Sequence, residues 1–127
     1  MFRILLVDDE AQERDGIRFL IEKYKLPLTV VEAQNGQKAL EKFKASGLRE
    51  YSCILMDIQM PVMDGYQATE AIRALPRADA KEIPIIALTA NAFAADLGKA
   101  HSAGMDDHIA KPIDMQVLVE ALGRLMA

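Results

Sequence analysis

Short, mostly apolar runs alternate along the chain with longer segments in which apolar residues recur every three or four positions. The runs are bounded by charged or turn-forming residues, which is the pattern of strands buried on both faces of a parallel sheet. They predict five strands, at Arg3–Val7, Leu28–Val31, Ser52–Met56, Ile85–Leu88 and Asp107–Ala110.

The longer segments have the periodicity of amphipathic helices, with one apolar face and one polar face. Glycine and proline residues such as Pro27 and Gly47 mark where these segments end. The predicted helices cover Ala11–Tyr24, Gln37–Ala45, Tyr66–Leu75 and Ala92–Ser102, and a fifth follows the N-cap residue Asp114 and extends to Leu125.

Five strand–helix units in succession indicate an α/β fold. Parallel neighbours need right-handed crossover connections, so the helices should cover both faces of the sheet in a three-layer sandwich. No linker or internal repeat interrupts the alternation, and 127 residues is the usual size of one compact unit. We therefore predict a single domain over residues 1–127.

The composition is that of a globular domain, with 51% hydrophobic and 27% charged residues. This balance excludes disorder and fibrous repeats. The formal net charge is −4, so the basic footprint that nucleic-acid binding requires is absent. We expect this domain to make no direct contact with nucleic acid.

Membrane insertion and secretion are also not expected. The longest stretch without a charge, Ile83–Ala95, is too short to span a bilayer. The apolar run Ile4–Val7 is followed at once by acidic residues, unlike a secretory signal. The single Cys53 excludes an intrachain disulfide and a multi-cysteine zinc site, which agrees with a reducing, cytoplasmic setting. We expect Cys53 to be an inert core thiol.

Candidate chemistry gathers where the predicted strands end. In an open parallel sheet, sites form beyond the carboxyl ends of the strands. The residues there are Asp8, Asp9, Asp57, Thr89 and Lys111. Three converging carboxylates repel one another unless a cation compensates, and oxygen-only ligands favour Mg²⁺. Lys111 supplies a fixed positive charge and Thr89 a hydroxyl donor, so the set outlines a pocket for a phosphoryl group.

An aspartate carboxylate can itself be the phosphoryl acceptor, and Asp57 is the natural candidate. A magnesium-dependent aspartyl phosphatase is an alternative of another class, but it needs a general acid and a substrate pocket that the sequence does not clearly offer. A flavin-binding domain is a third, and acidic residues after the first strand would repel its cofactor phosphate.

At these positions the chain resembles the receiver domain of two-component response regulators over essentially its full length. The resemblance implies a flavodoxin-like (βα)5 fold with strand order 2-1-3-4-5. The motifs that carry it are LLVDDE at Leu5–Glu10, MDIQMPVMDG at Met56–Gly65, ALTA at Ala87–Ala90 and AKPI at Ala110–Ile113.

The resemblance also implies roles for individual residues. Asp57 would be the phosphoacceptor, assisted by Lys111 and Thr89. Asp9, Asp57 and the backbone carbonyl of Gln59 would bind Mg²⁺ directly, and Asp8 would act through water. Further implied positions are Thr89 and His108 for switching, Gln59 and Asn91 for the dephosphorylation rate, and a cis peptide at Lys111–Pro112. His108 departs from the commoner aromatic residue, which could add pH sensitivity.

The implied partners are a histidine kinase or a histidine phosphotransfer domain, and the domain would catalyse its own phosphorylation and slow dephosphorylation without turning over external substrates. A phosphorylation-dependent homodimer is a further expectation. Residues Phe2–Leu40 resemble DNA-binding response regulators, whereas MDIQMPVMDGYQATEAIR, IIALTANAF and AGMDDHIAKPID resemble hybrid histidine kinases. The longer matches favour a hybrid-type relay. We expect the domain to be cytoplasmic, a location that includes the cytoplasmic part of a membrane-bound hybrid kinase.

Overall fold

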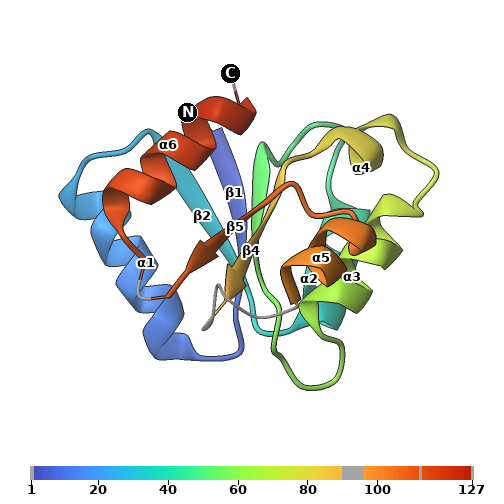
Figure 1. Ribbon diagram of the computed structural model, residues 1–127. Coiled ribbons are helices and arrows are strands. Elements are labelled where there is room, and N and C mark those ends of the chain that lie inside the picture. The colour runs from blue at the N-terminus through green and yellow to red at the C-terminus, as the bar shows by residue number, and fades with distance from the viewer. Residues whose placement is uncertain (1, 90–95, 112, 127) are drawn as a thin grey trace.

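The computed structural model describes residues 2–89, 96–111 and 113–126. Within these ranges five parallel strands form one sheet in the order β2-β1-β3-β4-β5, with helices packed around it (Figure 1). The predicted α/β class and strand order are therefore confirmed. The strands are β1 (Phe2–Val7), β2 (Leu28–Ala33), β3 (Cys53–Asp57), β4 (Ile85–Thr89) and β5 (Asp107–Ala110). The helices are α1 (Ala11–Lys23), α2 (Gly36–Ala45), α3 (Gly65–Arg73), α4 (Ala78–Glu82), α5 (Asp96–Ala103) and α6 (Met115–Met126).

The sheet separates two hydrophobic cores. Successive side chains of a strand point to opposite faces, so Ile4 and Leu6 enter one core while Leu5 and Val7 enter the other. Helices α1 and α6 cover the first face, and α2, α3 and α5 cover the second (Figure 1). All residues of β3 and β4 are buried, as expected for inner strands covered on both sides. This three-layer arrangement fixes where the strand ends lie.

Polar side chains begin three of the helices. Asn35 accepts a hydrogen bond from the Lys38 amide at 2.8 Å and starts α2. Asp64 forms a reciprocal capping box with Gln67 at the start of α3. Asp114 accepts from the backbone of the first turn of α6, as expected for its predicted N-cap position.

Most element boundaries lie within two residues of the sequence-based expectations, and three differences are informative. The short helix α4 was not predicted, because it lies between Pro76 and Pro84 and offers too few residues for a helical period to show. Strand β2 extends to Ala33, where it pairs with Val7, since backbone pairing rather than apolarity sets its end. Of the helix predicted over Ala92–Ser102, residues 92–95 lie outside the described part of the chain, and α5 begins at Asp96.

An ion pair between Arg77 and Asp79 lies near the residues that precede β3 and β4. The guanidinium forms two hydrogen bonds with the Asp79 carboxylate, at 2.9 and 2.8 Å, and stacks 4.5 Å from the ring centroid of Phe43. It also donates to the carbonyls of Phe43, Ser46 and Gly47. Arg77 therefore ties the end of α2 to the segment before β4.

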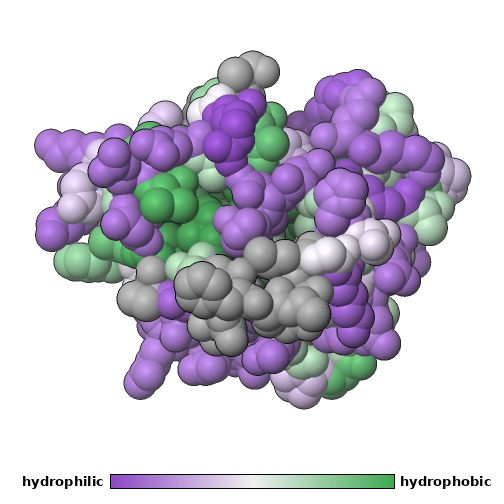
Figure 2. Space-filling model, in the orientation of Figure 1, coloured by the Kyte–Doolittle hydropathy of each residue, from purple (hydrophilic) through white to green (hydrophobic). Residues whose placement is uncertain are grey.

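The face of the molecule seen in Figure 2 is mostly hydrophilic, with a hydrophobic patch beside α6. A hollow of about 330 Å³ between β5 and α6 is lined by His108, Ile109, Ala110, Asp114 and Val117. Among the helices of the described residues, none is both long and apolar enough to span a bilayer.

Candidate functional site

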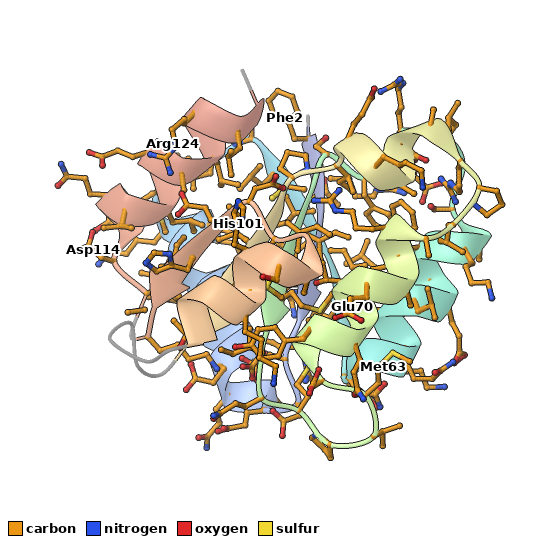
Figure 3. All side chains as sticks on the ribbon, turned by 45° about the vertical axis from the view of Figure 1, so that its right-hand side comes forward. Phe2, Met63, Glu70, His101, Asp114 and Arg124 are labelled. Atoms are coloured by element: carbon orange, nitrogen blue, oxygen red, sulfur yellow. The ribbon has the colours of Figure 1, made fainter. Side chains whose placement is uncertain are left out.

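The candidate residues meet at the carboxyl edge of the sheet because the strands are parallel. Asp57 and Thr89 are the last residues of β3 and β4, and Asp8 and Lys111 directly follow β1 and β5. This edge is far from the amino end of the sheet: Figure 3 shows Phe2, which starts β1, and Met63, in the loop after β3, at opposite ends of the molecule.

Three carboxylates converge there. One oxygen from each of Asp8, Asp9 and Asp57 lies within 4.8 Å of the other two. Asp8 is fully buried and Asp57 is 5% exposed, whereas Asp9 is exposed to solvent. The cluster therefore has two members held in the protein and one that is open to the surroundings, an arrangement that a cation can reach.

Burial makes the Asp57 carboxyl a weaker acid than usual. Loss of solvation raises the pKa of Asp57 to about 6, and repulsion from Asp8 adds to the rise, against the Gln59 amide and Lys111, which lower it. A positive charge placed at the cluster would favour the ionised carboxylate. The charge of Asp57 is therefore sensitive to a bound cation at a pH near 6.

Lys111 provides one positive charge to this cluster. Its ammonium Nζ lies 2.9 Å from Asp8 Oδ2 and 3.4 Å from Asp57 Oδ2. Burial alone would lower the pKa of Lys111, but the hydrogen bond to Asp8 and the charges of both carboxylates outweigh it and raise that pKa. The ammonium is therefore firmly charged, and it lies between the carboxylates of Asp8 and Asp57.

The second oxygen of each buried carboxylate bonds to its own loop. Asp8 Oδ1 accepts from the Glu10 amide at 3.0 Å, and Asp57 Oδ1 accepts from the Gln59 amide at 3.1 Å. Both are bonds from an aspartate to the amide two residues on, a common way to fix a turn. Each side chain is thereby oriented before any ligand arrives.

Gly65 packs against the backbone of Asp57, the phosphoacceptor candidate. A Cβ atom added at Gly65 would lie 2.3 Å from the carbonyl oxygen of Asp57, well inside any real contact distance. The Gly65 amide also donates to the Ile58 carbonyl at 3.3 Å. Its position reflects close packing of α3 against the end of β3.

The remaining predicted residues lie around this cluster. Thr89 is buried at the end of β4, and its carbonyl accepts from the Lys111 amide at 2.8 Å. His108 pairs with Ala87 in the β4–β5 register, two residues before the pair Thr89–Ala110. Its side chain therefore belongs to the same face of the sheet as Thr89, and it is exposed. The predictions for Asn91 and for a cis peptide at Pro112 fall outside the described residues.

The donor set fits a hard divalent cation. The cluster offers carboxylate oxygens and neither sulfur nor imidazole ligands. Mg²⁺ binds such oxygens, takes one or two carboxylates and retains several waters. The one exposed member, Asp9, leaves such water positions accessible. Asp8, Asp9 and Asp57 could therefore hold Mg²⁺.

Sequence reasoning missed Arg14 in the first turn of α1. Its Nη1 donates to the backbone carbonyl of Asp8 at 2.6 Å, and its Nε donates to Glu32 of β2 at 2.9 Å. The side chain is 13% exposed. No motif marks the position, and the only signal in the sequence is an arginine six residues after the acidic residue that it contacts.

Known proteins are similar to this chain in sequence and in structure. Hybrid signal transduction histidine kinase I of Dictyostelium discoideum is 37% identical over 122 residues, which cover 94% of this chain and 7% of that kinase. The receiver domain of a sensor histidine kinase from Pseudomonas aeruginosa PAO1, solved with a magnesium ion coordinated in its active-site cleft, is 36% identical. It superimposes with a TM-score of 0.86 over 98% of this chain and 97% of that one.

A third relative was solved in a complex. The receiver domain of a Saccharomyces cerevisiae response regulator, crystallised with a histidine phosphotransfer signalling protein, is similar with a TM-score of 0.82 and 26% identity. The match covers 98% of this chain and 88% of that one. The family model of the response regulator receiver domain matches residues 4–123. The chain therefore belongs to the response regulator receiver domain family of two-component and phosphorelay signalling.

Proposed function

We propose that Asp57 accepts a phosphoryl group from a phosphohistidine and that the domain thereby acts as a switch in a phosphorelay. The observation that carries this proposal is the position of Asp57 beside two further carboxylates and the Lys111 ammonium, at the carboxyl edge of the sheet. Phosphoryl transfer requires positioning of the acceptor and neutralisation of the transferred oxygens more than covalent chemistry by the protein.

The chain's own residues divide this task. Asp57 Oδ1 is held by the Gln59 amide, and its Oδ2 lies near Lys111, so the carboxylate has a fixed orientation. Lys111 would bind an oxygen of the incoming phosphoryl group, and the Thr89 hydroxyl would donate to another. Asp8, Asp9 and Asp57, with the backbone carbonyl of Gln59, would hold Mg²⁺. Bound Mg²⁺ would neutralise charge on the phosphoryl oxygens.

The donor would be a histidine kinase or a histidine phosphotransfer domain. The yeast receiver domain, crystallised with a histidine phosphotransfer protein, supports this class of partner. The similarity to hybrid kinases favours a hybrid-type relay over a DNA-binding regulator. Because this chain spans 7% of the length of the Dictyostelium kinase, any kinase activity would belong to other parts of such a protein.

Phosphorylation would be read at the surface of the last two strand–helix units. Thr89 and His108 lie on the same face of neighbouring strands. Movement of Thr89 toward the phosphoryl group would therefore open space toward His108. The hollow between β5 and α6, which His108 lines, would then change shape. A homodimer formed on phosphorylation would use this surface.

Transfer from a phosphohistidine tests the proposed function. A radiolabelled, phosphorylated histidine phosphotransfer domain from a hybrid kinase pathway is mixed with this chain and Mg²⁺. We expect the label to move to the wild-type chain and not to Asp57→Asn, which keeps the shape of the side chain without its nucleophilic carboxylate. Label that stayed on the histidine, or that moved equally to Asp57→Asn, would contradict the proposal.

A further inference from the structure

The backbone of Asp8 is held by a side chain from another element. Arg14 reaches back from α1, and its Nη1 lies 2.6 Å from the Asp8 carbonyl oxygen. The same guanidinium donates through Nε to Glu32 of β2 at 2.9 Å, so two elements fix its orientation. Only 13% of the Arg14 side chain is exposed, so it is largely shielded from water. A charge-assisted hydrogen bond is stronger in such a shielded position than in water.

This contact completes the hydrogen bonding of Asp8. The Asp8 amide donates to the Ala33 carbonyl at 3.1 Å. Its two carboxylate oxygens accept from Glu10 and Lys111, at 3.0 and 2.9 Å. The carbonyl oxygen accepts from Arg14, and it belongs to the peptide that joins Asp8 to Asp9. The orientation of that peptide determines the positions from which the Asp8 and Asp9 side chains project.

Arg18 is a natural comparison for Arg14. It lies one helical turn further along α1 and donates to the other carboxylate oxygen of Glu32 at 3.1 Å. Its side chain is 46% exposed. In the part of the chain that the structure describes, Arg14 alone of the two donates to Asp8. The two arginines share an ion-pair partner and a charge but differ in their contact with the acidic cluster.

We propose that Arg14 is a positioning residue for the cation site, which it shapes by fixing the Asp8–Asp9 peptide. The inference rests on the proposed function of that site. Groups that orient the ligands of a metal commonly change its affinity by about tenfold or more when they are removed. Arg14 touches the backbone of a ligand residue and so acts through Asp8 and Asp9.

The charge of Arg14 and its positioning role have opposite consequences, which makes the inference testable. A guanidinium near the cluster repels an approaching cation, so removing its charge alone would tighten Mg²⁺ binding. Loss of the hydrogen bond to Asp8 would loosen the Asp8–Asp9 peptide and weaken Mg²⁺ binding. The direction of the change in affinity therefore distinguishes the two effects.

The experiment compares Arg14→Gln with Arg18→Gln by calorimetric titration of the metal-free chain with Mg²⁺. Each substitution removes one positive charge and one ion pair with Glu32. We expect Arg14→Gln to weaken Mg²⁺ binding about tenfold and Arg18→Gln to leave it unchanged. Arg14→Lys, which keeps the charge but cannot reach two acceptors with a planar fork, should recover only part of the affinity.

A second readout needs no metal. Hydrogen exchange of the Glu10 amide, which donates to Asp8, should accelerate in Arg14→Gln and not in Arg18→Gln. Equal Mg²⁺ affinities in the two variants, tighter binding by Arg14→Gln, or unchanged exchange at Glu10 would overturn the inference while leaving the proposed function intact. A wild-type chain that bound no Mg²⁺ would overturn both.

Discussion

The Lys111 ammonium lies 2.9 Å from a carboxylate oxygen of Asp8, although 103 residues separate the two along the chain. The same ammonium approaches Asp57 at 3.4 Å. Lys111, which follows β5, thus holds two acidic side chains: Asp8, which follows β1, and Asp57, which ends β3. The proposed phosphoryl site depends on this long-range relationship.

Removing the Lys111 charge should slow phosphorylation sharply. In Lys111→Met, we expect the initial rate of labelling from a small phosphodonor to fall about a hundredfold, because a fixed positive group facing the developing charge is lost. Lys111→Arg keeps the charge in a different geometry and should retain part of the rate. A rate in Lys111→Met equal to that of the wild type would show that Lys111 does not contact the transferred group.

Neutralising Asp57 should stabilise the metal-free domain. The pKa of Asp57 is raised to about 6, mainly by burial, so its ionisation disfavours the folded state increasingly as pH rises from about 4 to 6. At pH 7.5, Asp57→Asn should therefore have a higher free energy of unfolding in urea, by on the order of 2 kcal/mol, and the difference should vanish below about pH 4.

Mg²⁺ should reverse this order of stability. It binds the ionised cluster of the folded wild-type chain, so adding it should raise the unfolding midpoint of the wild type and not that of Asp57→Asn. Lower stability of metal-free Asp57→Asn at pH 7.5, or an equal response of both proteins to Mg²⁺, would contradict the electrostatic account of the cluster.

A methyl group at Gly65 should disturb the site through the backbone of Asp57. In Gly65→Ala the new Cβ would meet the Asp57 carbonyl at 2.3 Å, so α3 or the end of β3 must shift, and we expect a loss of about 1 to 3 kcal/mol with slower phosphorylation. Gly16→Ala is the matched control, because nothing lies within 4 Å of a Cβ there and alanine favours the α1 helix. Urea unfolding and the labelling rate of both variants measure the effect. Equal behaviour of the two variants would exclude this packing constraint.

The ion pair at the opposite end of the sheet should matter for stability alone. The hydrogen bonds from Arg77 lower the pKa of the buried Asp79 carboxyl, so its contribution is complete above its unfolded pKa and is lost as pH falls through the folded one. Asp79→Ala leaves the Arg77 guanidinium without its carboxylate partner and should cost about 3 kcal/mol at pH 7. Its unfolding free energy should depend less on pH in acid than that of the wild type.

The exposed pair of Arg49 and Glu82 provides the control for this change. Their side chains are 63% and 64% exposed, and Glu82→Gln should change the unfolding free energy by less than about 1 kcal/mol. Neither variant should alter the phosphorylation rate, which separates this end of the sheet from the site. A loss of labelling in Asp79→Ala at a pH where it is fully folded would contradict that separation.

The convergence of Asp8, Asp57 and Lys111 was predictable because it depends on strand ends, and strands are marked by short apolar runs. The α/β class followed from the same pattern. The helix α4 was not predictable, since five residues between prolines carry no helical period. The role of Gly65 in packing and the reach of Arg14 to Asp8 depend on distances between elements, which a single sequence does not encode in any local signal.

The outward position of His108 also required the structure. The sequence places it on the fifth strand, but its exposure depends on β5 being the edge of the sheet and on how α5 and α6 flank it. Its proposed part in switching, like the roles of Gln59 and Asn91 in dephosphorylation, stays a prediction. Parallel β4–β5 pairing places His108 and Thr89 on one face of the sheet.

The most direct test of the central claim is mass spectrometry of the chain after incubation with a small phosphodonor, such as acetyl phosphate, with and without Mg²⁺. We predict that one phosphoryl group is added to the wild-type chain, that the addition requires Mg²⁺, and that proteolysis locates it in the peptide containing Asp57. Asp57→Asn should keep its original mass. An unchanged wild-type mass, or an equal gain by Asp57→Asn, would contradict the account.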